Sequence, residues 1–352
     1  MKALFISVIF VCLFSCHDNK QTGVITVNDF SKELSLSEVI SDIDIVALQI
    51  DSFALGEISD LCFCDSVVYV IDKLSGSISS FNKKNGQNIT FITQRGLGPN
   101  EYVDPIAIDC RMKEIFVLDR TNKIIVYDRD LNPIKTIKLE NMPFDFVATN
   151  DGFVIRNELG CSYKFSCLNK NGKEKAQFIP ITSNNDAGKS CIGGYTELAF
   201  FNDTVYVCDG ARSKFYLINN NVDSILKFDF ADYTIPENIN RNNYEGEFQF
   251  IDKERFFVTD DFIILNYFIP KNYQSHYTFY NKKTKVLFSG YFEPLDSVIP
   301  FFPRSRDGNS LVGFNYYYVL EENTAFRDAV AKKYPNTYFD AETFFLIYYF
   351  IK

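Results

Sequence analysis

The sequence contains no tryptophan, only two histidines and only three methionines. With His17 and His276 as the whole supply of imidazole, the chain is a poor candidate for a Cys/His zinc site or a histidine-activated nucleophile. Basic residues are also scarce, since 36 Lys and Arg stand against 45 Asp and Glu and leave a net charge of −9. This balance argues against a nucleic-acid partner, which needs a basic surface to neutralise phosphates.

Aromatic side chains are abundant, with 36 Phe and 21 Tyr, and 46% of the residues are hydrophobic. These values exclude a disordered chain, a collagen and a disulfide mini-scaffold. Phe and Tyr favour strands, so the composition indicates a β protein. A length of 352 residues suggests two or three domains of ~150 residues each, although large closed β architectures run longer as one unit.

Residues 1–15 have the pattern of a signal peptide, with Lys2 as the positive n-region and residues 3–14 as the apolar core. The next four-residue pattern, Leu13-Phe14-Ser15-Cys16, resembles a bacterial lipobox, in which Cys16 receives the lipid. Residues 16–23 then form a polar tether. The sequence therefore predicts an outer-membrane lipoprotein that faces the periplasm or the cell surface and contacts the lipid bilayer through its acyl chains. A secretory signal with an incidental cysteine is the alternative.

Seven of the nine cysteines remain after the signal peptide is removed and Cys16 is lipidated. An odd number at irregular spacing is not a disulfide framework. Cys62 and Cys64 stand two apart in a strand-like run, so they share a face and cannot easily bridge each other. Cys161 and Cys167 are the pair that we consider for a bridge, and the sequence leaves that question open.

A strand pattern that ends in aspartate recurs along the chain. Residues 67–72 and 114–119 each precede two further strand-like segments that are separated by polar turns. From Asp72 to Asp119 is 47 residues, the length of a four-stranded propeller blade. Weaker copies follow at residues 152–157, 204–209, 262–266 and 311–318. We therefore predict an all-β fold, a six-bladed β-propeller that occupies residues 24–352 as a single domain.

Several segments lie outside the six repeats. Residues 24–27 and 44–50 have strand character but no blade of their own, and we expect at least one of them to complete the last blade and remove a free edge. Residues 235–246 are polar and rich in asparagine, which indicates an excursion between blades. Residues 323–333 begin with a capping Asn or Thr and predict a short helix inserted in the last blade.

The sequence resembles the six-bladed β-propeller lipoproteins of Gram-negative anaerobes, whose blades are similar to NHL repeats. The resemblance is carried by the lipobox, the strand 67–72, the Phe81-Asn82-x-x-x-Gly86 hairpin and the loop Arg95-Gly96-Leu97-Gly98-Pro99-Asn100-Glu101-Tyr102. The family commonly has glycine where this loop has Asn100, a residue that tolerates φ > 0. The resemblance covers nearly the whole mature chain and is sharpest over residues 58–140. It implies the propeller fold and an envelope location but no assigned activity.

The glycine-rich loop is the first candidate ligand-binding element. It is not a phosphate loop, because no Lys-Ser or Lys-Thr follows and no long helix begins after it. In the functional interpretation, Arg95, Glu101 and Tyr102 lie at the rim of the central funnel and contact a ligand. In the structural interpretation, the glycines supply unusual backbone angles and Glu101 accepts backbone N–H groups beside Arg95.

The acids at the strand ends form a second candidate set. Asp72, Asp119 and Asp209, with Arg120 and Arg212 nearby, would lie in a ring on one face of a propeller and would suit a polar ligand or a peptide. Asx-turns at the ends of the second strands are the structural alternative. A basic cluster at residues 304–307 precedes the final blade and could grip a carboxylate or a phosphate, and a self-paired loop is the alternative there.

We therefore predict a binding or interaction module that acts through the propeller funnel or one loop face, with an unknown solute, peptide or envelope protein as partner. We assign no catalytic residue, metal or cofactor. An envelope hydrolase or lyase that uses funnel carboxylates and a structural component of an envelope complex are the alternatives. Clustered carboxylates with perturbed pKa values would favour the enzyme, and a formed pocket rimmed by Arg and Tyr would favour the solute binder.

Overall fold

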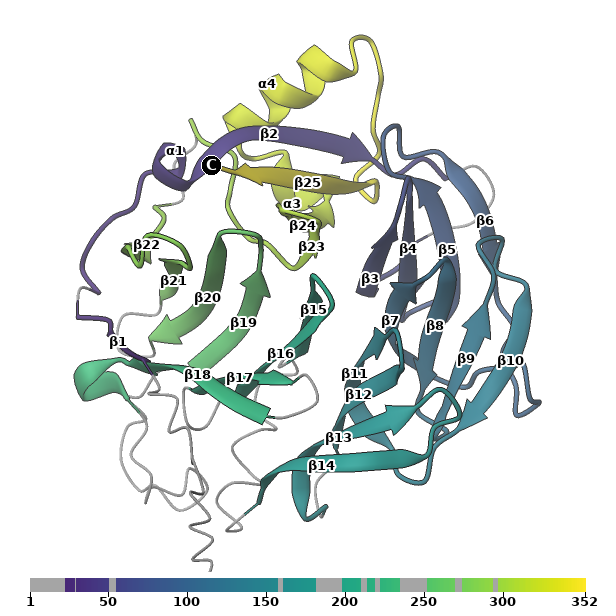
Figure 1. The fold of residues 1–352 in the computed structure, drawn as a ribbon. Coiled ribbons are helices and arrows are strands. Elements are labelled where there is room, and N and C mark those ends of the chain that lie inside the picture. The colour runs from purple at the N-terminus through teal and green to yellow at the C-terminus, as the bar shows by residue number, and fades with distance from the viewer. Residues whose placement is uncertain are drawn as a thin grey trace, which may run out of the picture.

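In the computed structural model, six β-sheets surround a common centre (Figure 1). The structure describes residues 23–28, 30–50, 55–157, 161–181, 198–209, 214–218, 222–234, 252–269, 274–293 and 297–352. Each sheet contains four antiparallel strands that form one blade, and we number the blades 1–6 from the sheet that contains β3. The six-bladed β-propeller predicted from the sequence is confirmed.

Within each blade, the four strands are ordered outward from the axis. The first strands surround the axis, where those of neighbouring blades contact one another: β3 (Ile58–Cys64), β7 (Pro105–Arg111), β11 (Pro143–Thr149), β15 (Leu198–Phe201), β19 (Asp252–Val258) and β23 (Ser305–Asp307). The second strands are β4 (Val67–Asp72), β8 (Glu114–Asp119), β12 (Gly152–Asn157), β16 (Thr204–Asp209), β20 (Phe262–Ile269) and β24 (Ser310–Tyr316). The third strands are β5 (Ser77–Asn82), β9 (Lys123–Tyr127), β13 (Tyr163–Asn169), β17 (Lys214–Ile218), β21 (Gln274–Asn281) and β25 (Phe344–Ile351). The outermost strands are β6 (Asn88–Ile92), β10 (Pro133–Lys138), β14 (Glu174–Pro180), β18 (Val222–Asp229), β22 (Leu287–Tyr291) and β2 (Ile40–Ala47).

The ring is closed by pairing of the two ends of the chain. Strand β2 lies antiparallel to β25, with Ile45 opposite Ile347, and it forms the outermost strand of blade 6 (Figure 1). The N–H of Gln49 then donates to the carbonyl of Gly86 at 2.8 Å, which connects the segment after β2 to blade 1. The prediction that an N-terminal strand completes the last blade is therefore confirmed.

A second N-terminal strand extends blade 4. Strand β1 (Gly23–Thr26) runs parallel to β18, with Gly23 opposite Leu226 and Thr26 opposite Asp229, so this sheet has five strands. The N–H of Val27 also donates to the carbonyl of Asp229 at 2.8 Å. One short segment before the first repeat thus covers the outer edge of a blade that is distant in sequence.

The core lies between the faces of neighbouring blades. The second strands β4 and β8 are buried on both faces, which explains their nearly continuous apolar sequences. Aromatic rings fill much of this space: Tyr277, Phe301 and Tyr349 stack between blades 5 and 6, with ring centroids 4.9 Å apart for both successive pairs. Edge-to-face contacts of this kind stabilise the blade interface beyond simple area burial.

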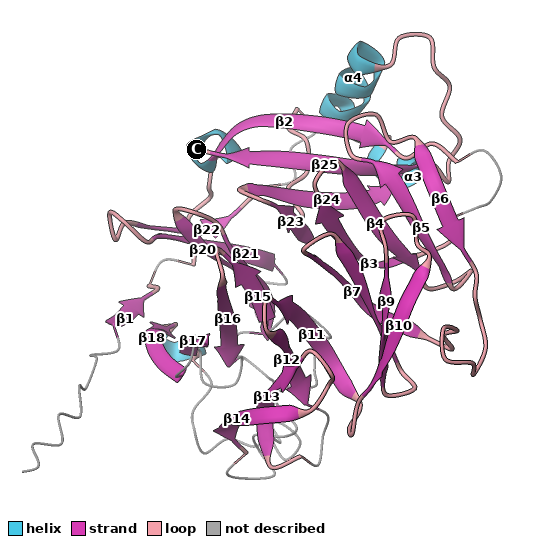
Figure 2. Ribbon diagram, turned by 45° about the vertical axis from the view of Figure 1, so that its right-hand side comes forward, coloured by secondary structure: helices cyan, strands magenta, loops and turns pink. Residues whose placement is uncertain are grey.

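Helices are short, and two of them are inserted in blade 6 (Figure 2). Helices α3 (Tyr317–Leu320) and α4 (Thr324–Lys333) connect β24 to β25, while α1 (Leu36–Val39) precedes β2 and the 3₁₀ turn η1 (Ala231–Tyr233) follows β18. The side chain of Asn323 accepts the N–H of Phe326 at 2.8 Å and caps α4, at the place where the sequence predicts a short helix. No helix in the described part of the chain is long and apolar enough to cross a membrane.

A disulfide joins Cys64 of β3 to Cys110 of β7, with the two Cα atoms 5.8 Å apart. Cys161 and Cys167, the pair considered from the sequence, are not bridged to each other. The first strands of neighbouring blades converge at the axis, and this brings together two cysteines that are 46 residues apart. The predicted excursion at residues 235–246 lies outside the described residues.

Candidate functional site

The glycine-rich loop between β6 and β7 folds back on its own carboxylate. Glu101 Oε2 accepts the N–H of Gly98 at 2.8 Å, and a Cβ placed on Gly96 would lie 2.0 Å from the same oxygen. These glycines therefore leave room for the carboxylate of Glu101 in its capping position. Gly96, Gly98 and Asn100 all lack the positive φ found at several other described residues, so this loop does not use the tolerance of Asn100 for φ > 0.

Arg95 and Tyr102 form the base of this loop. The guanidinium of Arg95 lies against Gly76, where a Cβ would come within 1.9 Å of Nη2. Tyr102 is fully buried, and its hydroxyl donates to the carbonyl of Ile92 at 3.0 Å. Burial raises the pKa of Tyr102 to about 12. This geometry matches the structural interpretation, and a ligand contact by Arg95, Glu101 or Tyr102 stays a prediction.

The carboxylates of Asp72 and Asp119 tie each blade to the segment that enters it. Asp72 accepts the N–H groups of the two residues before β3, at 2.9 and 2.8 Å, and also that of Leu74 at 3.0 Å. Asp119 accepts the N–H groups of Val103 and Asp104 at 2.9 and 2.7 Å. Burial alone would raise the pKa of Asp72, but the hydrogen bonds outweigh it and the pKa is lowered.

The remaining residues of this set have different surroundings. Asp209 forms a buried ion pair with Lys164 of blade 3, with Oδ1 and Nζ 2.7 Å apart. Arg120 is exposed and pairs with Asp104 at 2.6 Å. Arg212 lies outside the described residues. The described members of this set, Asp72, Asp119, Asp209 and Arg120, do not line the two channel cavities described below.

The central channel is instead lined by three aspartates of the first strands. Asp60 Oδ2 accepts the N–H of Ile108 at 2.8 Å, and Asp109 Oδ2 accepts the N–H of Ala148 at 2.7 Å. These two carboxylates therefore link blade 1 to blade 2 and blade 2 to blade 3. For Asp145, only Oδ1 has a hydrogen-bond partner among the described residues, the N–H of Phe146 at 2.8 Å.

All three carboxyl groups hold their protons more strongly than usual. Burial raises the pKa of Asp60 to about 7 and those of Asp109 and Asp145 to about 6. Repulsion between neighbouring carboxylates acts in the same direction on Asp60 and Asp145, while the Arg156 guanidinium opposes it at Asp145. The cluster therefore exchanges protons near neutral pH.

The inner part of the channel is a cavity of about 290 Å³ that the three aspartates share with Arg111 and Arg306. Arg306, on β23, crosses to blade 4, where it donates to the carbonyl of Phe200. Arg111 lies over the ring of Phe200, with Cζ 3.8 Å from the ring centroid, and pairs with Asp203 at 2.6 Å. Residues 305–307 of the basic cluster are thus the strand β23 at the axis, and Arg304 directly precedes it.

The outer part of the channel is a cavity of about 520 Å³, which we call the wide mouth. Its wall is formed where the first strands begin, and it contains four basic residues: Lys73, Arg156, Arg255 and Arg304. Its acidic residues are Glu57, Asp60 and Asp145. The cations of Arg156 and Arg304 lie over the rings of Phe144 and Phe314, each with Cζ 5.4 Å from the ring centroid.

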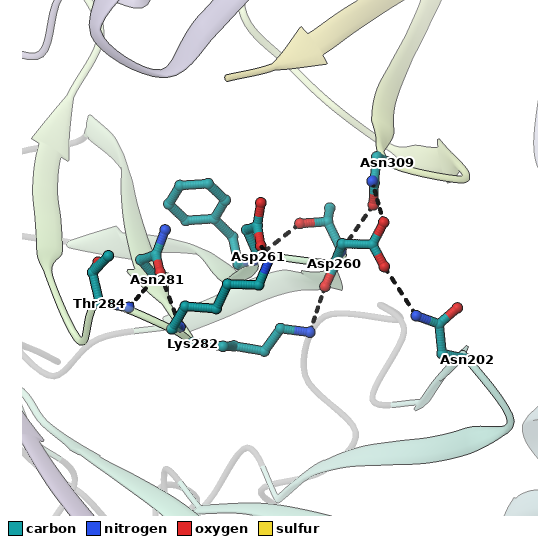
Figure 3. Close-up of polar contacts among 10 residues, drawn as sticks. Asn202, Asp260, Asp261, Asn281, Lys282, Thr284 and Asn309 are labelled. Carbon is teal, nitrogen blue, oxygen red and sulfur yellow. Dashed lines mark hydrogen bonds and ion pairs between the residues drawn. The ribbon is translucent and has the colours of Figure 1, made fainter.

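The other end of the channel, where the first strands end, is surrounded by hairpin turns that bond to one another. Asn202 Nδ2 donates to Asp260 Oδ1 at 2.9 Å, and the N–H of Asp260 donates to Asn309 Oδ1 at 2.8 Å (Figure 3). These contacts join the turns of blades 4, 5 and 6. We interpret this end as a structural belt, because its polar groups are directed to one another.

Of the residues that line the channel, the sequence pointed to the basic cluster at 304–307, which supplies Arg304 and Arg306, but not to the three aspartates. Their signal is an acid inside an otherwise apolar first strand, as in Ile58-Ser59-Asp60-Leu61-Cys62 and Ile106-Ala107-Ile108-Asp109-Cys110. In the described part of the chain, no group of three or more His, Cys, Asp or Glu side chains is arranged to hold a metal ion.

Comparisons with known proteins agree with the fold. The family model described as "Domain of unknown function (DUF4934)" matches residues 22–339. A crystal structure of a candidate exported protein from Bacteroides fragilis has 14% identity and a TM-score of 0.71, and the match covers 94% of this chain and 99% of that one. A DUF4221 member from Bacteroides vulgatus has 11% identity and a TM-score of 0.49, with 89% and 97% covered. No protein with a curated description matches the sequence.

Proposed function

We propose that this chain, which belongs to the DUF4934 family, is an exported lipoprotein that binds a polar solute or a peptide in the wide mouth of its central channel. One observation carries the proposal: a cavity of about 520 Å³ is lined by charged side chains from four blades. Its volume and its few convergent polar groups are typical of small-ligand sites. Phe144, Phe314 and Ile106 supply apolar surface on the same wall.

Recovery of a solute with the protein tests this proposal. The full chain would be solubilised from membranes in detergent and purified, and the solutes that remain with it would be identified by mass spectrometry. Ser59 is an exposed residue on the wall of the mouth, so Ser59→Trp should block the cavity. Ser37, exposed on α1, offers Ser37→Trp as the matched control.

We expect a solute near one copy per chain with the wild type and with Ser37→Trp, and its loss from Ser59→Trp. Equal recovery with Ser59→Trp, or no solute with any variant, would contradict the proposal. A stoichiometric protein recovered in place of a solute would favour a structural component of an envelope complex.

The proposed anchor rests on the signal peptide and on Cys16, which lie outside the described residues. We expect the Cys16→Ala variant to leave the membrane fraction, because acylation of that thiol is the proposed attachment. The Cys161→Ala variant should stay in the membrane fraction, since this thiol plays no part in the attachment. A Cys16→Ala chain that sediments with membranes as the wild type does would refute the anchor.

A hydrolase or lyase is the second candidate, and the aspartate cluster is the observation that favours it. Both oxygens of Asp60 and Asp109 accept backbone N–H groups. Asp145 uses only Oδ1 in this way, so its Oδ2 is the oxygen that could exchange a proton with a substrate. If the protein is an enzyme, the wild type should consume a solute that the Asp145→Asn variant binds but leaves unchanged. Consumption at the same rate by both proteins would exclude this role for Asp145.

A further inference from the structure

The basic groups of the wide mouth come from different sides of the channel. Lys73 follows β4 in blade 1 and Arg156 lies on β12 in blade 3, whereas Arg255 lies on β19 in blade 5 and Arg304 precedes β23 in blade 6. Four basic residues thus stand against three acidic ones, a charge of +1 when all are ionised. In a chain with a net charge of −9, this makes the mouth a local basic site that attracts anions.

The acidic groups of the mouth are partly engaged by the fold itself. Asp60 accepts the N–H groups of Leu61 and Ile108 at 2.9 and 2.8 Å, so both of its oxygens hold the blades together. Asp145 lies opposite Arg156 in the β11–β12 pairing, and the Arg156 charge stabilises its ionised form. These carboxylates therefore offset the four cations only in part.

Arg304 is the most exposed guanidinium of the mouth. Arg156 is buried and Arg255 is half-buried, whereas Arg304 is exposed and lies on the wall of the cavity. Its backbone N–H donates to the carbonyl of Val312 at 2.8 Å, and the Phe314 ring lies beside its guanidinium. The ring shields one side of the cation from water and leaves the N–H groups for a polar partner.

The charge balance favours a monoanion over a phosphate dianion. A carboxylate matches the small positive excess of the mouth, and its planar pair of oxygens fits the guanidinium fork. A dianion would be repelled more strongly by Glu57 and Asp145 on the same wall.

We infer that the wide mouth receives the carboxylate group of its ligand and that Arg304 is the main contact to that group, an inference that rests on the proposed binding function. The ligand is accordingly a solute or peptide with a free carboxylate. Its neutral part contacts the apolar surface that Phe144, Ile106 and Phe314 supply to the wall.

Titration calorimetry of the purified full chain at low salt tests this inference. The probes are acetyl-alanyl-alanine with its C-terminal amide, gluconate with glucose, and inorganic phosphate. Arg304→Gln removes the charge, Arg304→Lys keeps the charge but not the fork, and Arg327→Gln on α4 is the matched control outside the channel. Thermal unfolding of each variant confirms that it is folded.

We expect at least one carboxylate probe to bind at least tenfold more tightly than its neutral partner and than phosphate. Arg304→Gln should weaken that binding at least tenfold, with Arg304→Lys intermediate and Arg327→Gln unchanged. Tighter binding of acetyl-alanyl-alanine would indicate a peptide ligand, and tighter binding of gluconate would indicate a sugar acid.

Three results would overturn the inference: no carboxylate probe binds, the neutral partner binds equally well, or folded Arg304→Gln binds as the wild type does. The proposed function fails separately, in the recovery experiment. A co-purified solute that is lost from Ser59→Trp but retained by Arg304→Gln would preserve the channel site and remove the carboxylate contact.

Discussion

The Cys64–Cys110 disulfide offers the clearest stability test of the fold, because it joins the first strands of blades 1 and 2 at the axis. The bridge closes a loop with a sequence separation of 46 residues. In the chain-entropy treatment, a cross-link over a loop of that length stabilises the folded state by about 4 kcal/mol at 25 °C. We therefore expect Cys110→Ala to lower the free energy of unfolding by about 4 kcal/mol, or the melting temperature by about 6 °C for a chain of this size.

Urea unfolding followed by circular dichroism under non-reducing conditions would measure this loss. Cys62 provides the control, because it is a buried free thiol on the same strand and the same face as Cys64. Cys62→Ala should cost only about 1 kcal/mol, the loss expected from a small cavity. Wild type in a thiol reductant should match Cys110→Ala. A difference below about 1 kcal/mol between Cys110→Ala and the wild type would refute the reasoning.

Three further predictions concern polar contacts that the structure places inside the propeller. First, because the folded state keeps a proton on Asp60 up to a pKa of about 7, the unfolded state binds fewer protons and the free energy of unfolding should fall as pH rises from 5 to 7.5. Urea midpoints across that range should show a flatter slope for Asp60→Asn, and an unchanged slope would contradict this. Second, Lys164→Ala removes the cation of the buried Lys164–Asp209 pair and should cost about 3–5 kcal/mol, whereas the Lys164→Met/Asp209→Leu double variant should cost much less; equal losses in chemical unfolding would argue against a buried pair. Third, Gly96→Ala and Glu101→Ala should each cost about 1 kcal/mol, because either one removes the carboxylate cap of the loop. The double variant should cost no more than one of them, and additive losses in the same assay would show that the two residues do not interact.

The architecture could be predicted because each blade has its own local strand pattern and this pattern is repeated along the chain. The pattern of residues 67–72 and 114–119 recurs at blade length, and each copy needs its neighbours to cover both faces. A closing N-terminal strand, expected at residues 24–27 or 44–50 and found at Ile40–Ala47, followed from the same physics, since a ring without it would leave a free edge beside β25. The parallel pairing of β1 with β18 has no such local signal, because strand character does not specify which distant edge a segment meets.

The candidate site was harder to predict because it depends on the angle at which blades meet. Asp72 and Asp119 form a repeated motif, but they repeat because each carboxylate accepts backbone N–H groups of the segment that enters its blade. The residues of the wide mouth differ from blade to blade and therefore do not form a motif. The disulfide was missed for the same reason, since Cys64 and Cys110 belong to different repeats.

A single backbone feature nevertheless explains how four of these residues reach the mouth. In blades 1, 2, 3 and 5 the pairing of the first strand with the second shifts register by one residue near the start of the first strand. The residues just after these shifts, which all line the wide mouth, are Asp60, Ala107, Asp145 and Arg255.

Bulges of this kind aim a side chain away from the regular pleat, and they are common beside binding sites. The scaffold thus presents one variable position at the channel in each of these four blades. In this chain those positions are acidic in blades 1 and 3 and basic in blade 5. The surrounding pattern is repeated from blade to blade, whereas the residues at these four positions differ. Substitutions at these positions would therefore change the ligand of the channel without changing the propeller fold.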